Sequence, residues 1–177
     1  MSNYAILAHT AANAANAGAL TSAGADNTFG LSTLNAKFTD SATIVTLASS
    51  AWTHSATGIY QIQAVVGFGI AGGMGSAQAR AGLYNLGTTA FAAYEGGSDE
   101  IIGSSGVLTS SGTSTGYVEL FGRYTVSSTA HQYAIYMAGD ASTGTWYSTA
   151  IAQGAPALGV TSGTKPEIYK LVQITQE

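Results

Sequence analysis

The sequence predicts an all-β protein, a jelly-roll β-sandwich of about ten short antiparallel strands. Three observations support this fold class. Apolar and polar residues alternate with a period of two in runs rich in Tyr, Ile and Val, and clusters of Gly, Ser and Thr separate these runs. Segments with apolar residues at helical spacing are scarce. We expect a single domain over residues 1–177, with an Ala/Asn/Gly-rich N-terminal loop at about residues 8–28.

Four runs show the clearest alternation and are expected to form the main strands. They span residues 58–68, 117–126, 131–138 and 167–175. In the first run the predicted core face consists of Tyr60, Ile62, Ala64, Val66 and Phe68. Shorter strands are expected at residues 4–7, 29–34, 44–47, 78–84, 90–94, 106–109 and 145–150. In the strand at 78–84, alternation points Ala79, Ala81 and Leu83 inward.

A glycine triplet, Gly67-x-Gly69-x-x-Gly72, matches the turn that surrounds the pyrophosphate in dinucleotide-binding folds. Such a fold also places an acidic residue about 20 residues further on, where Glu95 stands. It requires a helix after the third glycine, however, and the residues after Gly72 contain more glycines and then alternate as a strand. We therefore interpret the triplet as a mobile connection between two strands and expect no bound cofactor.

Sequence motifs for catalysis or metal binding are also absent. The chain has no cysteine, which excludes thiolate chemistry. His9, His54 and His131 do not have the short spacing of metal ligands. The segment GTSTG at 112–116 matches a nucleophile elbow, but a strand rather than a helix is expected after it. We expect no catalytic, cofactor-binding or metal-binding residue, and therefore no enzyme.

Low charge restricts the possible partners. Charged residues make up 8% of the chain, the net charge is −4, and the five basic residues form no run. This pattern argues against nucleic-acid binding and against an anionic membrane surface, and the longest apolar region is too short for a membrane helix. A surface with so little charge tends to self-associate unless an assembly buries it. The sequence therefore favours an oligomer or a component of a lattice.

The order of several short motifs resembles a family of bacteriophage virion domains that are similar to the complement-1q/tumour-necrosis-factor jelly roll. The matching motifs are YAIL at 4–7, LN at 34–35, GIYQI at 58–62, QARAGLYN at 78–85, YAI at 133–135 and EIYKLVQI at 167–174. The family usually has a basic residue shortly before the Leu-Asn pair, where this chain has Ser32 and Thr33. The resemblance implies a ten-stranded sandwich that assembles as a tight homotrimer.

The resemblance also implies a place on the phage particle. We expect a capsid decoration or cement protein, made in the host cytoplasm and bound to the major capsid protein or another virion protein. The alternative is the tip of a tail or head fibre that binds a host-surface receptor or glycan. Trp52 and Trp146 could stack on sugars there, and a place in the core is an equal alternative for either. Aromatic residues on both faces of some strands point to a subunit interface. The expected trimer-interface residues are Phe121, Tyr133, Ile135 and Tyr169.

Overall fold

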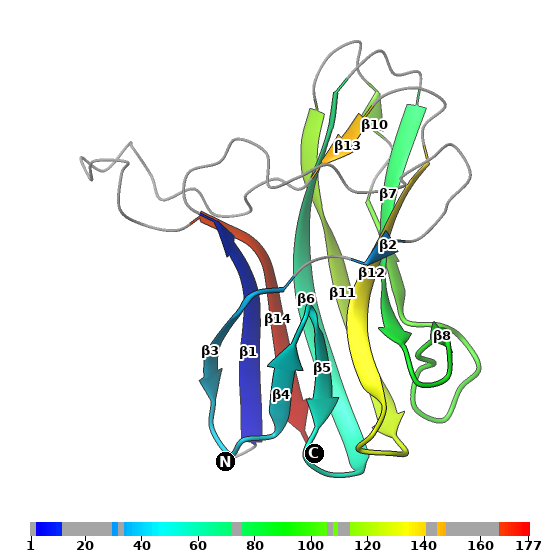
Figure 1. Cartoon of the computed structure of the whole chain (residues 1–177). Coiled ribbons are helices and arrows are strands. Elements are labelled where there is room, and N and C mark those ends of the chain that lie inside the picture. The colour runs from blue at the N-terminus through cyan, green and yellow to red at the C-terminus, as the bar shows by residue number, and fades with distance from the viewer. Residues whose placement is uncertain are drawn as a thin grey trace.

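The chain forms two antiparallel β-sheets that face each other across one core (Figure 1). The computed structural model describes residues 3–11, 30–31, 34–71, 76–105, 108–109, 114–140, 145–147 and 167–177. All regular secondary structure in these ranges is β-structure, and none of it is helical. The first and last strands pair with each other, with Asn3 opposite Gln176, so the two ends of the chain lie at the same end of the sandwich.

The first sheet has six strands, five of them in the order β11-β6-β14-β1-β3. Their bounds are Ser114–Val126 for β11, Gly58–Ala71 for β6, Glu167–Gln176 for β14, Asn3–Ala11 for β1 and Ala36–Asp40 for β3. The sixth strand, β13 (Thr145–Tyr147), also pairs with β6. The ladder between β6 and β11 is the longest, because all thirteen residues of β11 pair with β6. We call this the six-stranded sheet.

The second sheet has eight strands, five of them in the order β10-β7-β12-β5-β4. Their bounds are Leu108–Thr109 for β10, Ser76–Asn85 for β7, Gln132–Asp140 for β12, Ala51–His54 for β5 and Val45–Ala48 for β4. β2 (Gly30–Leu31) pairs with β12, and both β8 (Ala90–Phe91) and β9 (Ile102–Ser104) pair with β7. Because the chain crosses repeatedly between the sheets, this is the predicted jelly-roll sandwich.

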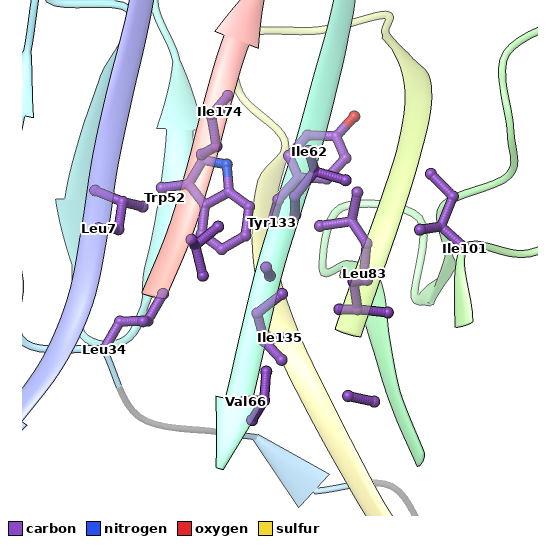
Figure 2. Packing of buried hydrophobic residues seen from close by; sticks show 14 of the residues in the cluster. Leu7, Leu34, Trp52, Ile62, Val66, Leu83, Ile101, Tyr133, Ile135 and Ile174 are labelled. Carbon is purple, nitrogen blue, oxygen red and sulfur yellow. The ribbon is translucent and has the colours of Figure 1, made fainter. Parts of the chain in front are cut away.

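The predicted alternation determines the core. Tyr60, Ile62 and Val66 of β6 are fully buried, as are Ala79, Ala81 and Leu83 of β7. Figure 2 shows side chains from both sheets meeting between them, among them Leu7 and Ile174 from the six-stranded sheet and Trp52 and Ile135 from the other. The four long predicted strands are therefore confirmed, as are the inward faces predicted for β6 and β7.

Several boundaries differ from the prediction. β1 continues to Ala11, so residues 8–11, assigned to the N-terminal loop, belong to a strand; its partner strand β14 supplies the pairing that a local Ala-rich pattern does not reveal. Residues 12–28 of that expected loop lie outside the described residues. The described ranges hold fourteen strands rather than about ten, since β2, β8, β9, β10 and β13 have only two or three residues. β3, β5 and β9 were not predicted.

The glycine triplet also differs from its interpretation as a connection. Gly67 and Gly69 lie inside β6, opposite Tyr117 and Thr115 of β11. Gly72 lies outside the described residues. Two of the three glycines are thus part of a continuous antiparallel ladder, and a strand at this point is incompatible with the strand-to-helix turn that holds a pyrophosphate.

Asp40 holds the corner where the chain passes from the six-stranded sheet to the eight-stranded sheet. Its carboxylate accepts hydrogen bonds from the main-chain N–H groups of Ile44 at 2.6 Å and Val45 at 3.4 Å. It also pairs with the Lys37 ammonium at 3.0 Å. The turn includes Thr43 with a φ of 53°, a conformation that costs energy for a β-branched residue. The carboxylate satisfies the turn's N–H groups and so stabilises this strained corner.

The outer edge of β11 is covered by the segment that contains β9. The Arg123 carbonyl accepts a hydrogen bond from the Glu95 N–H at 2.7 Å, and the Phe121 carbonyl accepts one from the Tyr94 hydroxyl at 3.1 Å. Gly103 of β9 lies so close to β11 that a Cβ there would overlap the main-chain oxygen of Glu119. An edge strand with free carbonyls invites pairing with other chains, and this cover prevents it.

We predict that Gly103→Ala lowers the free energy of unfolding by roughly 1–3 kcal/mol, because the added methyl group must displace main chain rather than a flexible side chain. Gly97→Ala is the matched control, since a Cβ at Gly97 makes only ordinary contacts, the nearest at 3.7 Å. Urea unfolding followed by fluorescence measures both. Equal stability of the two variants would contradict the close packing of β9 on β11.

Candidate functional site

The outer face of the six-stranded sheet, directed away from the core, has the features of an interaction surface. Register places one row of residues across five strands of this face: Phe121, Gln63, Gln173, Ile6 and Thr39. On β11, Phe121 is 60% exposed and Tyr117 is 59% exposed. Large exposed aromatic side chains four residues apart on the same face of one strand are unusual on a surface that stays in water. We call this the assembly face.

The centre of the assembly face carries no charge. The outward side chains of the two central strands are Ile59, Gln61, Gln63 and Val65 on β6, and Leu171, Gln173 and Thr175 on β14. Charged groups lie toward β11, where Glu119 and Arg123 are exposed. Interfaces have uncharged centres with aromatic residues, and their charges lie at the rim. The face therefore has the composition of a protein interface.

Arg123 forms a small ion-pair network at the edge of the assembly face. Its Nε and Nη2 atoms donate to the Glu177 carboxylate at 2.6–3.1 Å, in a bidentate arrangement. Its Nη1 lies 3.2 Å from the Glu95 carboxylate. These groups are solvent-exposed, so each pair contributes little to stability. Their effect is geometric, because they connect the last residue of the chain, β11 and the segment that covers its edge.

The four residues expected at a trimer interface lie in different environments. Phe121 is exposed on the assembly face, as an interface residue must be in the single chain. Tyr133 and Ile135 are 1% and 0% exposed in the core, which corrects the expectation for these two, since the eight-stranded sheet turns them toward the other sheet. Tyr169 belongs to β14, but its side chain lies outside the described residues. The expected interface did not include Tyr117, although the period-two alternation of this strand puts it on the same face as Phe121.

The two tryptophans do not form an exposed sugar-stacking pair. Trp52 is fully buried in the core (Figure 2), so of its two expected roles it has the core one and not the sugar-stacking one. Its indole N–H makes no hydrogen bond of ordinary geometry. Its position near the Tyr124 hydroxyl lowers the pKa of that tyrosine, against the larger effect of burial, which raises it. Trp146 pairs with Ile70 through β13, and its side chain lies outside the described residues.

His54 lies inside the sandwich among three tyrosines. Its ring centroid is 4.3 Å from that of Tyr60, 5.7 Å from Tyr124 and 5.0 Å from Tyr133. Its Nε2 atom and the Tyr124 hydroxyl share a hydrogen bond of 2.9 Å. Burial lowers the pKa of His54 to about 4, and burial raises the pKa of Tyr124 well above its usual value. The cluster is therefore uncharged near neutral pH and acts as a polar part of the core.

The remaining candidates for chemistry do not assemble. Among the described residues, no group of three or more His, Asp or Glu side chains has the arrangement of a metal site. His131 is near Asn85, with Nδ1 3.4 Å from the amide nitrogen, and His9 is on β1 beside Lys170. In the same part of the chain, no helix has the length and hydrophobicity to span a membrane.

Comparison with known proteins identifies the fold but not a sequence family. No family model and no curated protein matches the chain. A crystal structure of murine APRIL at pH 5.0 superposes with a TM-score of 0.50 at 6% sequence identity, covering 100% of both chains. The chain has a tumour-necrosis-factor-like jelly-roll fold. A second murine APRIL structure, at pH 8.5, aligns with a TM-score of 0.44 at 5% identity, again over 100% of both chains. At such low identity the similarity concerns the fold alone.

We predict that the buried His54 makes the protein sensitive to acid. Its pKa of about 4 in the folded state is below the unfolded value of 6.5, so the unfolded chain binds more protons between these pH values. The contribution of His54 to stability is therefore fully present above pH 6.5 and falls by about 3 kcal/mol as the pH drops to 4.

The measurement is urea unfolding at several pH values for the wild type, His54→Gln and the control His131→Gln. The His54 variant should lose stability less steeply between pH 6.5 and 4 than the wild type and the control do. Identical slopes in all three proteins would exclude His54 as the source of the acid sensitivity.

Proposed function

We propose that the protein is a non-enzymatic structural protein of a bacteriophage particle, a homotrimer that decorates or cements the capsid. The observation that carries the proposal is the assembly face, with Tyr117 and Phe121 exposed beside an uncharged centre. The location on a virion and the trimeric state are inferred from the resemblance to phage virion domains. The low charge of the whole chain agrees with a protein whose surface is buried in an assembly.

The occupant of the assembly face is a second copy of the same chain. Glutamine and threonine side chains both donate and accept hydrogen bonds, so Gln63, Gln173 and Thr175 can bond to a different surface of a neighbouring copy, as the head-to-tail contacts of a trimer require. The face offers no cluster of one charge that would select a partner of the opposite charge. Because segment 93–104 covers the edge of β11, a neighbouring copy at this side of the face binds through side chains rather than by extending the sheet at β11.

We predict that Phe121→Asp dissociates the trimer, because a carboxylate placed in an apolar interface loses its hydration. The matched control is Thr46→Asp, which adds the same charge at an exposed position of β4 in the other sheet. Light scattering after size-exclusion chromatography should give about three times 17.8 kDa for the wild type and the control, and about 17.8 kDa for Phe121→Asp. A wild-type monomer, or a Phe121→Asp trimer, would contradict the assignment of the interface.

The capsid role has a separate test. Phage particles that lack this protein should lose infectivity at a lower temperature than complete particles, and adding purified protein should restore their resistance. The Phe121→Asp variant should fail to restore it. Equal heat resistance with and without the protein, together with competition between the purified protein and phage for adsorption to host cells, would favour the receptor-binding fibre tip instead.

A further inference from the structure

A pocket of about 320 Å³ opens at the side of the sandwich where β8 is labelled in Figure 1. Its walls come from the loop around β8 and from the segment after it, including Phe91, Tyr94 and Glu95. Tyr124 and Tyr133 line its inner end, because both are only 1% exposed. Its volume is at the lower end of the range for small-molecule sites, roughly 300–1,000 Å³. No residue of this pocket belongs to the uncharged centre of the assembly face.

The Tyr94 ring is held in place before any ligand arrives. Its hydroxyl donates to the Phe121 carbonyl at 3.1 Å, and its main-chain N–H donates to the Asp99 carbonyl at 2.9 Å. The ring lies against Gly122, where a Cβ would be 3.0 Å from a ring carbon of Tyr94. The residue is nevertheless 40% exposed. An aromatic surface fixed in this way loses little conformational entropy when a ligand stacks on it.

The opposite wall is also preorganised. The Asn85 side-chain oxygen accepts hydrogen bonds from the N–H groups of Gly87 at 2.9 Å and Thr88 at 3.3 Å. These bonds set the turn that brings Thr88 to the pocket. Thr125, at the end of β11, adds a second hydroxyl. The pocket thus combines aromatic surface with hydroxyl groups, the two features that a ligand with apolar faces and many hydroxyls requires.

The charge of the pocket selects against ions. Glu95 provides a carboxylate, which can accept two hydrogen bonds from neighbouring hydroxyl groups. Arg123 lies 3.2 Å from this carboxylate and compensates its charge. Asp99 and Glu100 lie on the same segment and Glu177 also binds Arg123, so the surroundings disfavour an anion. A cation would have to compete with the guanidinium for Glu95.

We propose that this pocket binds a neutral sugar ring, stacked on Tyr94 and hydrogen-bonded through Glu95 and the hydroxyls of Thr88 and Thr125. The carbon–hydrogen face of a pyranose complements an aromatic ring, and its hydroxyl groups complement the carboxylate and the threonines. A structural trimer would not require such a site. The protein therefore carries a carbohydrate-binding function beyond its role in assembly, and the assignment does not depend on the trimer.

The experiment is saturation-transfer NMR and calorimetric titration of the whole protein with galactose, glucose and N-acetylglucosamine. Sialic acid and choline are the charged comparisons. At least one neutral sugar should bind with a millimolar dissociation constant, and its ring protons should receive the strongest saturation. Tyr94→Ala should weaken binding roughly tenfold or more. Tyr94→Phe keeps the ring and should lose much less.

The paired carboxylates provide a matched control. Glu95→Gln and Glu177→Gln each remove one partner of Arg123, but only Glu95 lines the pocket. Sugar binding should weaken in Glu95→Gln and stay unchanged in Glu177→Gln. Binding of choline or sialic acid alone, absence of sugar binding, or full binding by Tyr94→Ala would overturn the proposal. The native mass of each variant, measured in parallel, distinguishes a lost pocket from a lost trimer.

Discussion

The contact between segment 93–104 and the outer edge of β11 is the constraint on which both candidate sites depend. Glu95 and Tyr94 bind the carbonyls of Arg123 and Phe121, and Gly103 packs against Glu119. Since β9 pairs with β7 and β11 pairs with β6, these contacts also join the two sheets along one side. The closure uses main-chain groups that would otherwise be open to a further strand. It therefore determines how this protein can associate.

Association at the β11 side is left to side chains once that edge is closed. Phe121 shows the division clearly, because its carbonyl binds the covering segment while its ring is 60% exposed on the assembly face. Tyr94 belongs to the covering segment, donates its hydroxyl to that carbonyl and forms a wall of the pocket. One short segment thus separates a flat, uncharged surface suited to another copy of the chain from a concave surface suited to a small ligand.

Burial opposes charge on the polar groups inside the sandwich. It lowers the pKa of His54 to about 4 and that of Lys170 to about 7, because the low-polarity interior opposes the charged form of each. Lys170 occupies a core position of β14 in register with Val66 of β6. His54 is therefore uncharged at neutral pH, whereas Lys170 titrates near neutral pH. Among the described residues, ion pairs are concentrated at the Asp40 corner and around Arg123.

The sequence by itself determined the all-β class, the long strands and the inward faces of β6 and β7, because period-two alternation is a local property that burial enforces. Alternation in β14 also puts Lys170 on the same face as Val172 and Ile174, and all three are buried. Only the tertiary structure decided that Tyr133 and Ile135 fill the core while Phe121 remains exposed, since both faces of these strands carry apolar residues. It also decided that Gly67 and Gly69 continue a strand and that Tyr94 and Glu95 meet β11. Those outcomes depend on partners distant in sequence, which no local pattern records.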